Sequence, residues 1–103
     1  MPDKKPSYDL EEIKRMFLNR KGRYFRDEAR DDAVKINYLS IEDMMGAIKN
    51  IAHSEFDKTM ESETVRGLML DVYHSSDGAE EIYIKFSKNQ SGTGVILWSF
   101  KRK

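Results

Sequence analysis

Residues 68–101 read LMLDVYHSSDGAEEIYIKFSKNQSGTGVILWSFK, and this stretch decides the fold of the 103-residue chain. Within it apolar and polar residues alternate, which is the period of a half-buried β-strand. Two polar segments interrupt the alternation, one containing Asp77-Gly78 and one running from Lys88 to Gly94. Such segments form the turns of hairpins. The stretch therefore predicts consecutive antiparallel strands at Leu68–His74, Ile82–Ser87 and Val95–Lys101.

The alternation also predicts which side chains share a face of the sheet. In the second strand, Ile82, Ile84 and Phe86 lie on one face, because successive side chains point to opposite sides of a strand. Tyr83 and Lys85 lie on the other face. The same rule divides the last strand into Ile96, Trp98 and Phe100 on one face, and Val95, Leu97, Ser99 and Lys101 on the other.

Helical patterns precede the sheet. The first helix is predicted to begin near Asp9, and a second, weaker one covers Arg26–Val34. The third follows Ser40, an N-cap residue with Asp43 three positions later. Between the third helix and the sheet, residues 54–60 are predicted to form a short helical turn that leads into a polar loop over residues 61–66.

The order of these elements predicts the fold class. Helices followed by consecutive strands indicate an α+β protein whose N-terminal helices pack on one face of a C-terminal three-stranded antiparallel sheet. A chain of this length holds one domain. We expect residues 9–103 to form that domain and residues 1–8 to be a flexible tail.

Composition narrows the class of protein. The chain has no cysteine, which excludes disulfides, thiolate metal sites and a cysteine nucleophile. The N-terminal residues MPDKKPSYDL lack the apolar core of a signal peptide. No apolar run approaches the roughly 20 residues that span a bilayer. We therefore expect a soluble, cytoplasmic protein with no membrane partner.

Charge is distributed unevenly although the net charge is zero. Residues 13–26 and 82–103 contain lysines and arginines but no acidic residue, whereas residues 27–81 are strongly acidic. Two basic blocks around an acidic middle are compatible with a phosphate-binding face on a neutral protein. Ordinary solvated charge explains the same pattern equally well.

The usual catalytic motifs are missing from the sequence. The glycine-rich segment Gly92-Thr-Gly94 lacks the Gly-Lys-Ser/Thr ending of a P-loop. The two histidines, His53 and His74, do not have the spacing of metal ligands, and no nucleophile elbow is present. We expect no metal site.

The outer face of the predicted sheet is more informative. Tyr83 and Lys85 project from its middle strand, beside a last strand that ends Lys101-Arg102-Lys103. Cations neutralise phosphates, and an aromatic ring stacks on a base or donates a hydrogen bond, so this face suits an RNA backbone. The alternative is a solvated outer face without a ligand.

Four segments together resemble the MqsR family of motility quorum-sensing regulator toxins. They are residues 54–60 (SEFDKTM), 71–73 (DVY), 82–85 (IYIK) and 98–101 (WSFK). The resemblance extends from about Ser7 to the C-terminus. It implies a RelE-like fold and a messenger-RNA interferase of a type II toxin–antitoxin system. It also implies a cognate antitoxin that contains zinc and binds DNA.

The resemblance assigns roles to particular residues. The active site of this family contains two lysines, a glutamine and a tyrosine, and three of these positions fall on Lys58, Tyr83 and Lys101 as catalytic residues. The fourth falls on Leu70, where leucine replaces the family's glutamine and cannot donate or accept a hydrogen bond. Lys85, Arg102 and Lys103 are expected to attract the phosphates of the substrate.

The implied chemistry needs neither metal nor cofactor. A ribose 2′-hydroxyl of single-stranded mRNA attacks the adjacent phosphodiester, which yields a cyclic phosphate and a free 5′-hydroxyl. Positioned cations stabilise the negative charge that develops on the phosphoryl oxygens. Lys58 and Lys101 are the candidates for that role, while Tyr83 orients the phosphate or takes part in proton transfer.

Two other functions are compatible with the sequence. A module of the same fold that binds RNA or an antitoxin without cleaving is favoured by Leu70, since the family's glutamine is missing. A purely regulatory protein, whose acidic middle docks a basic partner, is the second alternative.

Overall fold

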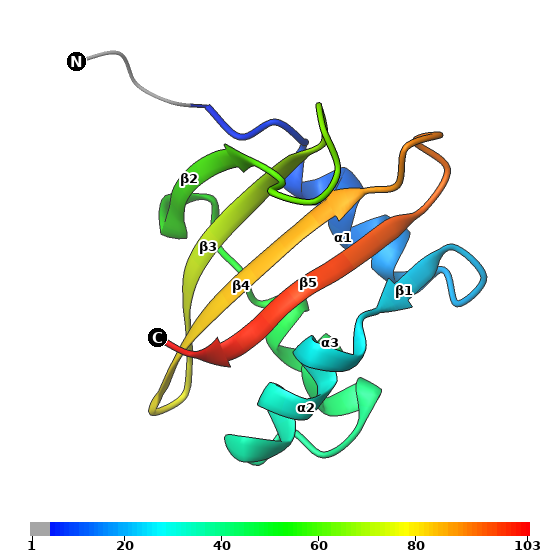
Figure 1. Cartoon of the computed structure of the whole chain (residues 1–103). Helices are drawn as coiled ribbons and strands as arrows, with labels where there is room; N and C mark the ends of the chain where they lie inside the picture. Colours follow the sequence, from blue (N-terminus) through cyan, green and yellow to red (C-terminus); the bar gives the residue numbers. More distant parts are fainter. Residues whose placement is uncertain (1–4) are drawn as a thin grey trace.

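The computed structural model describes residues 5–103. Among these residues no helix is long and apolar enough to cross a membrane. Figure 1 shows the course of the chain. In chain order the elements are α1 (Leu10–Leu18), β1 (Arg23–Phe25), α2 (Asp27–Lys35), α3 (Ile41–Lys49), the 3-10 turn η1 (His53–Glu55), β2 (Phe56–Glu61), β3 (Met69–Asp77), β4 (Glu80–Lys88) and β5 (Val95–Arg102).

All strands belong to one sheet, with β1 and β2 at its two edges (Figure 1). The order is β1-β5-β4-β3-β2, in which β1 runs parallel to β5 and the other neighbours are antiparallel. The sheet is thus five-stranded and mixed. The α+β class is confirmed, whereas the prediction of a three-stranded antiparallel sheet is wrong.

The two strands that the sequence analysis missed are the edge strands. β1 has only three residues, too few to show an alternating pattern, and its partner β5 is distant in the sequence. β2 overlaps the predicted helical turn over residues 54–60, and the helical structure there is limited to η1. Its pairing with β3 is irregular between Phe56 and Lys58, which removes the alternation that marks a strand.

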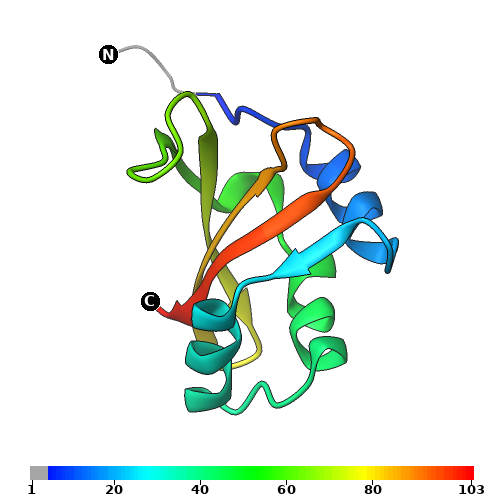
Figure 2. The same cartoon turned by 45° about the vertical axis from the view of Figure 1, so that its right-hand side comes forward.

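α1 and α3 cover one face of the sheet, as predicted, whereas α2 packs against β5 (Figure 2). The buried core on that face draws on every helix and on alternate positions of the central strands, and its members include residues exposed by no more than 2%: Ile13, Phe17, Ala29, Ala33, Met44, Ile48, Tyr73, Ile82, Ile84 and Phe86. The predicted split of β4 into an apolar face and a face with Tyr83 and Lys85 is therefore confirmed.

A row of aromatic rings crosses this core. Phe86 stacks on Tyr73 with the ring centroids 5.5 Å apart, and it meets Phe17 edge-on at 6.2 Å. Phe56 contacts Tyr73 from β2, and Phe25 contacts Phe17 from β1. The row thus connects both edge strands to the centre of the domain.

A β-bulge interrupts β2. Phe56 pairs with Tyr73 and Lys58 pairs with Val72, so Asp57 is an extra residue without a partner in β3. An extra residue shifts the alternation of a strand by one position. As a result, Phe56 packs toward the helices and Lys58 lies opposite Val72 on the other face of the sheet.

A second bulge interrupts β5 and corrects the predicted faces of that strand. Ser99 pairs with Lys85, and Leu97 pairs with the next residue of β4, so Trp98 is the extra residue. Leu97 and Phe100 are both fully buried in the core, although strict alternation places them on opposite faces. The prediction that Trp98 shares a face with Phe100 is wrong because the bulge intervenes.

The N-terminal segment is attached to β3. Both oxygens of the fully buried Asp71 carboxylate accept hydrogen bonds, from the backbone N–H of Ser7 at 2.9 Å and of Tyr8 at 3.0 Å. The Tyr8 hydroxyl donates to the carbonyl of Met69 at 2.7 Å. Of the tail expected over residues 1–8, residues 1–4 lie outside the described residues.

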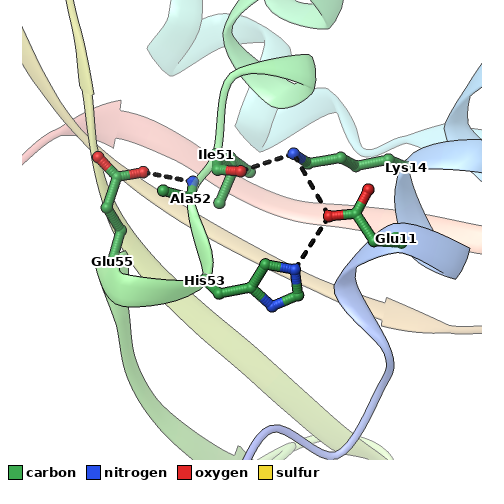
Figure 3. A network of polar contacts seen from close by, with 6 residues as sticks. All are labelled: Glu11, Lys14, Ile51, Ala52, His53 and Glu55. Carbon is green, nitrogen blue, oxygen red and sulfur yellow. Dashed lines mark hydrogen bonds and ion pairs between the residues drawn. The ribbon is translucent and has the colours of Figure 1, made fainter.

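Polar contacts also fix the segment between α3 and β2 (Figure 3). Lys14 of α1 donates to the carbonyl of Ile51 at 2.6 Å, and Glu11 lies 3.0 Å from Nε2 of His53. Glu55 accepts from the backbone N–H of Ala52 at 2.8 Å. His53 is therefore engaged with α1, on the helix side of the sheet.

A tight backbone contact joins Gly22, just before β1, to Gly94 in the loop before β5. A Cβ at Gly94 would lie 2.7 Å from the carbonyl oxygen of Gly22 and 2.8 Å from the Asn89 side chain. That carbonyl accepts from Val95 N–H and is fixed. Gly94→Ala is therefore expected to lower the free energy of unfolding by about 1–3 kcal/mol, measured by urea denaturation.

Gly46 provides the matched control. It lies within α3, and a Cβ there would meet nothing within 4 Å. Gly46→Ala is expected to raise stability by about 0.5–1 kcal/mol, because alanine restricts the unfolded chain and favours a helix. Equal effects of the two substitutions would contradict the close approach at Gly94.

Candidate functional site

The candidate site is the open face of the sheet, which is the face opposite the helices. Register places Lys58 of β2 opposite Val72 of β3, Val72 opposite Lys85 of β4, and Lys85 opposite Ser99 of β5. Directly opposite side chains of an antiparallel pair are neighbours, with Cβ atoms about 4.5–5.5 Å apart. This row therefore crosses four strands and carries two lysines.

The next row carries the other candidate residues. Tyr83 of β4 lies opposite His74 of β3 on one side and opposite Lys101 of β5 on the other. The Lys101 ammonium lies 5.2 Å from the centroid of the Tyr83 ring, within the range of a cation–π contact. The Tyr83 and His74 rings are 5.7 Å apart and tilted by 40°.

The two bulges bring the outer lysines to this face. If Asp57 were paired regularly with β3, strict alternation from Phe56 would turn Lys58 to the side of the helices. A regularly paired Trp98 would turn Lys101 to that side in the same way. Bulges commonly re-aim side chains in this way next to functional sites. The result is a lysine cluster formed by Lys58, Lys85 and Lys101.

The positive charges of the other two lysines act on Lys85. Burial lowers the pKa of Lys85 below its usual value, and the positive charges of Lys101 and Lys58 lower it further. Glu28 and Glu63 act in the opposite direction. The Lys85 ammonium is consequently a stronger acid than a solvated lysine and gives up its proton more readily.

The pKa of Tyr83 is shifted in the opposite direction. Burial raises the pKa of its phenol, and the negative charge of Asp57 adds to the increase. The phenol therefore stays protonated throughout the neutral range. As a neutral hydroxyl it can donate a hydrogen bond to an anionic oxygen, but it is a poor proton acceptor.

Arg102 and Lys103 do not join the cluster. Arg102 pairs with Ile82, a core residue, so its side chain leaves the strand on the other face, and its guanidinium lies 3.5 Å from Glu80. The Lys103 ammonium lies 4.0 Å from Glu81. Each of these cations is thus near a carboxylate at the end of the hairpin.

Leu70 lies on the open face next to the cluster. It pairs with Met60 and is only 2% exposed. Together with Lys85 and Trp98 it lines a pocket of about 210 Å³. The pocket has an apolar wall at the position where the resemblance predicts a glutamine.

The Trp98 ring forms part of that pocket and is held on both sides. Its indole N–H donates to the Ser87 hydroxyl at 2.9 Å. The guanidinium of Arg26, the N-cap residue of α2, lies 4.3 Å from the ring centroid. This stack gives the open face a rigid aromatic surface beside Lys85.

Three residues of this face were not recognised as site residues in the sequence. His74 was considered only as a metal ligand, and in the described part of the chain no group of three or more histidines and carboxylates could hold a metal ion. Asp57 lies 3.4 Å from Nε2 of His74. Asp57 and Trp98 occupy bulges, which alternation cannot reveal, whereas the position of His74 opposite Tyr83 follows from pairing the hairpin.

Comparison with known proteins adds one finding. The family model described as motility quorum-sensing regulator, toxin of MqsA, matches residues 5–102, nearly the whole chain. No curated protein matches the chain.

Proposed function

Because the chain belongs to the family of motility quorum-sensing regulators, toxins of MqsA, we propose that it is an endoribonuclease. The proposed reaction is cleavage of single-stranded mRNA through attack of a ribose 2′-hydroxyl on the adjacent phosphodiester. The observation that supports it most is the lysine cluster beside Tyr83. A neutral protein that gathers three cations on one sheet face has a local site for a phosphate, whatever its net charge.

The positions and charges of these residues give them different roles in the proposed reaction. Lys58 and Lys101 are exposed and stabilise the negative charge that grows on the phosphoryl oxygens in the transition state. The protonated phenol of Tyr83 donates a hydrogen bond to one of these oxygens. Lys85, whose pKa is lowered, is the lysine best suited to protonate the leaving 5′-oxygen.

The test uses a short single-stranded RNA and a matched substrate with one 2′-deoxy nucleotide at the cleaved position. In EDTA the RNA is expected to be cut, to a 2′,3′-cyclic phosphate and a 5′-hydroxyl that mass spectrometry identifies. The 2′-deoxy substrate is expected to remain intact at that position. Cleavage of the deoxy substrate, or a 5′-phosphate product, would contradict the proposed mechanism.

We also propose that a cognate antitoxin neutralises the protein in the cytoplasm. The family description, toxin of MqsA, supports an antitoxin partner, and the resemblance extends this to a zinc-containing, DNA-binding protein. A pull-down repeated after nuclease treatment tests direct association. A complex lost with the nuclease would mean that RNA, and not protein contact, holds the two together.

A module that binds without cleaving is the second candidate, and Leu70 is the observation that favours it. Leu70→Gln is expected to change the cleavage rate by less than tenfold, because Lys58, Tyr83 and Lys101 remain. It is also expected to lower the free energy of unfolding by about 1–3 kcal/mol, since it buries an amide in an apolar wall. The isosteric control Leu70→Met should cost less than about 1.5 kcal/mol. Cleavage that appears only in Leu70→Gln would establish the binding module instead.

A further inference from the structure

The proposed cleavage requires a group that removes the proton of the 2′-hydroxyl. A solvated lysine has a pKa near 10.4, so it is charged at neutral pH and holds no free electron pair for this purpose. The raised pKa of Tyr83 keeps its phenol protonated. Histidine is the side chain whose ordinary pKa, about 6.5, lies close to neutrality.

His74 is the histidine of the open face. It lies opposite Tyr83 in the hairpin, and the two rings are 5.7 Å apart. Its side chain is 29% exposed, so a bound substrate can reach it. His53, in contrast, is engaged with Glu11 on the helix side.

The Asp57 carboxylate lies next to the His74 ring. One carboxylate oxygen lies 3.4 Å from Nε2, and the bulge in β2 turns this carboxylate toward β3. A carboxylate on one imidazole nitrogen fixes the tautomer and orientation of the ring and stabilises the cation formed when the other nitrogen accepts a proton. Nε2 is the nitrogen beside the carboxylate, and Nδ1 is the other ring nitrogen.

We propose that His74 is the general base of the RNA cleavage reaction and that Asp57 is its positioning residue. This inference rests on the proposed endoribonuclease function. As the bond from the 2′-oxygen to phosphorus forms, the hydroxyl proton passes to Nδ1 of His74. The bond from phosphorus to the 5′-oxygen breaks, and that oxygen takes a proton from a lysine ammonium of the cluster.

The charged surroundings of His74 on this face come from three strands. β2 contributes Asp57 and Lys58, β4 contributes Glu81, Tyr83 and Lys85, and β5 contributes Lys101. The Asp57 carboxylate is the group at ion-pair distance. Its negative charge compensates the positive charge of the imidazolium that forms during the reaction, on a face that carries three ammonium groups.

The first experiment compares pH profiles of kcat/KM for RNA cleavage. The wild-type profile is expected to fall toward acid pH, because protonation removes the base. His74→Gln is expected to lower kcat/KM by about 10²–10⁴-fold, and its profile should no longer have the acid limb, the fall in rate toward acid pH. Added imidazole should partly restore the activity of His74→Gly. Asp57→Asn should lose less, while its acid limb remains.

His53→Gln is the matched control and should retain both the rate and the acid limb. If His74→Gln keeps wild-type activity and the acid limb, His74 is not the base, and Lys85 becomes the candidate. If wild-type protein cleaves no RNA at all, the proposed function fails, which is a different result. A folded His74→Gln variant is recognised by an unchanged urea midpoint.

The second experiment separates a general base from a general acid. In a substrate whose leaving 5′-oxygen is replaced by sulfur, the leaving group departs as a thiolate and needs no proton. The defect of His74→Gln is expected to persist with this substrate, because the 2′-hydroxyl must still lose its proton. Recovery of the variant to wild-type rates would show that His74 acts on the leaving group, which would overturn the assignment.

Discussion

Lys58→Ala and Lys101→Ala are each expected to lower kcat for RNA cleavage by about 10²–10³-fold while the domain stays folded. Removing one group that stabilises transition-state charge typically costs this much. The two ammonium groups act on charge that is fully developed only in the transition state, so kcat should fall more than KM rises. Steady-state kinetics on a defined RNA measure both quantities.

The structure predicts that these variants remain folded. Both side chains are exposed, so their truncation leaves no cavity. β2 and β5 are held in the sheet by backbone hydrogen bonds to their neighbouring strands. Lys35→Ala is a suitable control, because Lys35 lies on α2 and pairs with Asp32 at 3.3 Å. Wild-type rates in both cluster variants would exclude this cluster as the catalytic site.

Phe86→Ala is expected to produce the largest loss of stability, about 3–5 kcal/mol in the free energy of unfolding. Phe86 is fully buried and contacts Tyr73 and Phe17 at the centre of the aromatic row. Small domains are stable by only about 5–15 kcal/mol, so this loss is a large share of the total. Urea denaturation measures it directly.

The same substitution tests how the core supports the site. Phe86 follows Lys85 in β4, so the core face of this strand fixes the open face. Phe86→Leu keeps most of the buried volume and is expected to cost clearly less than Phe86→Ala. Activity should disappear at the temperature where Phe86→Ala unfolds, and not before. A loss below about 1 kcal/mol for Phe86→Ala would mean that the aromatic row does not support the sheet.

Regular segments of this chain could be predicted from its sequence because one physical signal dominates each of them. β4 alternates without interruption, and α3 has the complete capping box of Ser40 and Asp43, in which each side chain accepts a backbone N–H. β1 could not be predicted, since it is defined only by pairing with β5. A strand that depends on long-range contacts leaves no local pattern.

In the candidate site, too, the residues of regular segments could be predicted, and those placed by irregular pairing could not. Tyr83 and Lys85 follow from alternation in β4, and the resemblance to a known family identified Lys58 and Lys101. The sequence could not explain how these lysines reach the face of Tyr83, because extra residues at Asp57 and Trp98 decide it. Arg102 shows the converse case: its position next to Lys101 in the sequence suggested a shared role, but its side chain leaves β5 on the opposite face.

The two bulges also determine where the chain can lose one residue without moving the following side chains to the other face of the sheet. In a regular strand, the loss of one residue turns every later side chain to the other face. At Trp98 the loss would instead leave Ser99 opposite Lys85 in an unbroken ladder, with Phe100 still facing the core. The same reasoning applies to Asp57 in β2. Each bulge is therefore a position where a single-residue deletion can be absorbed while the lysines keep their places.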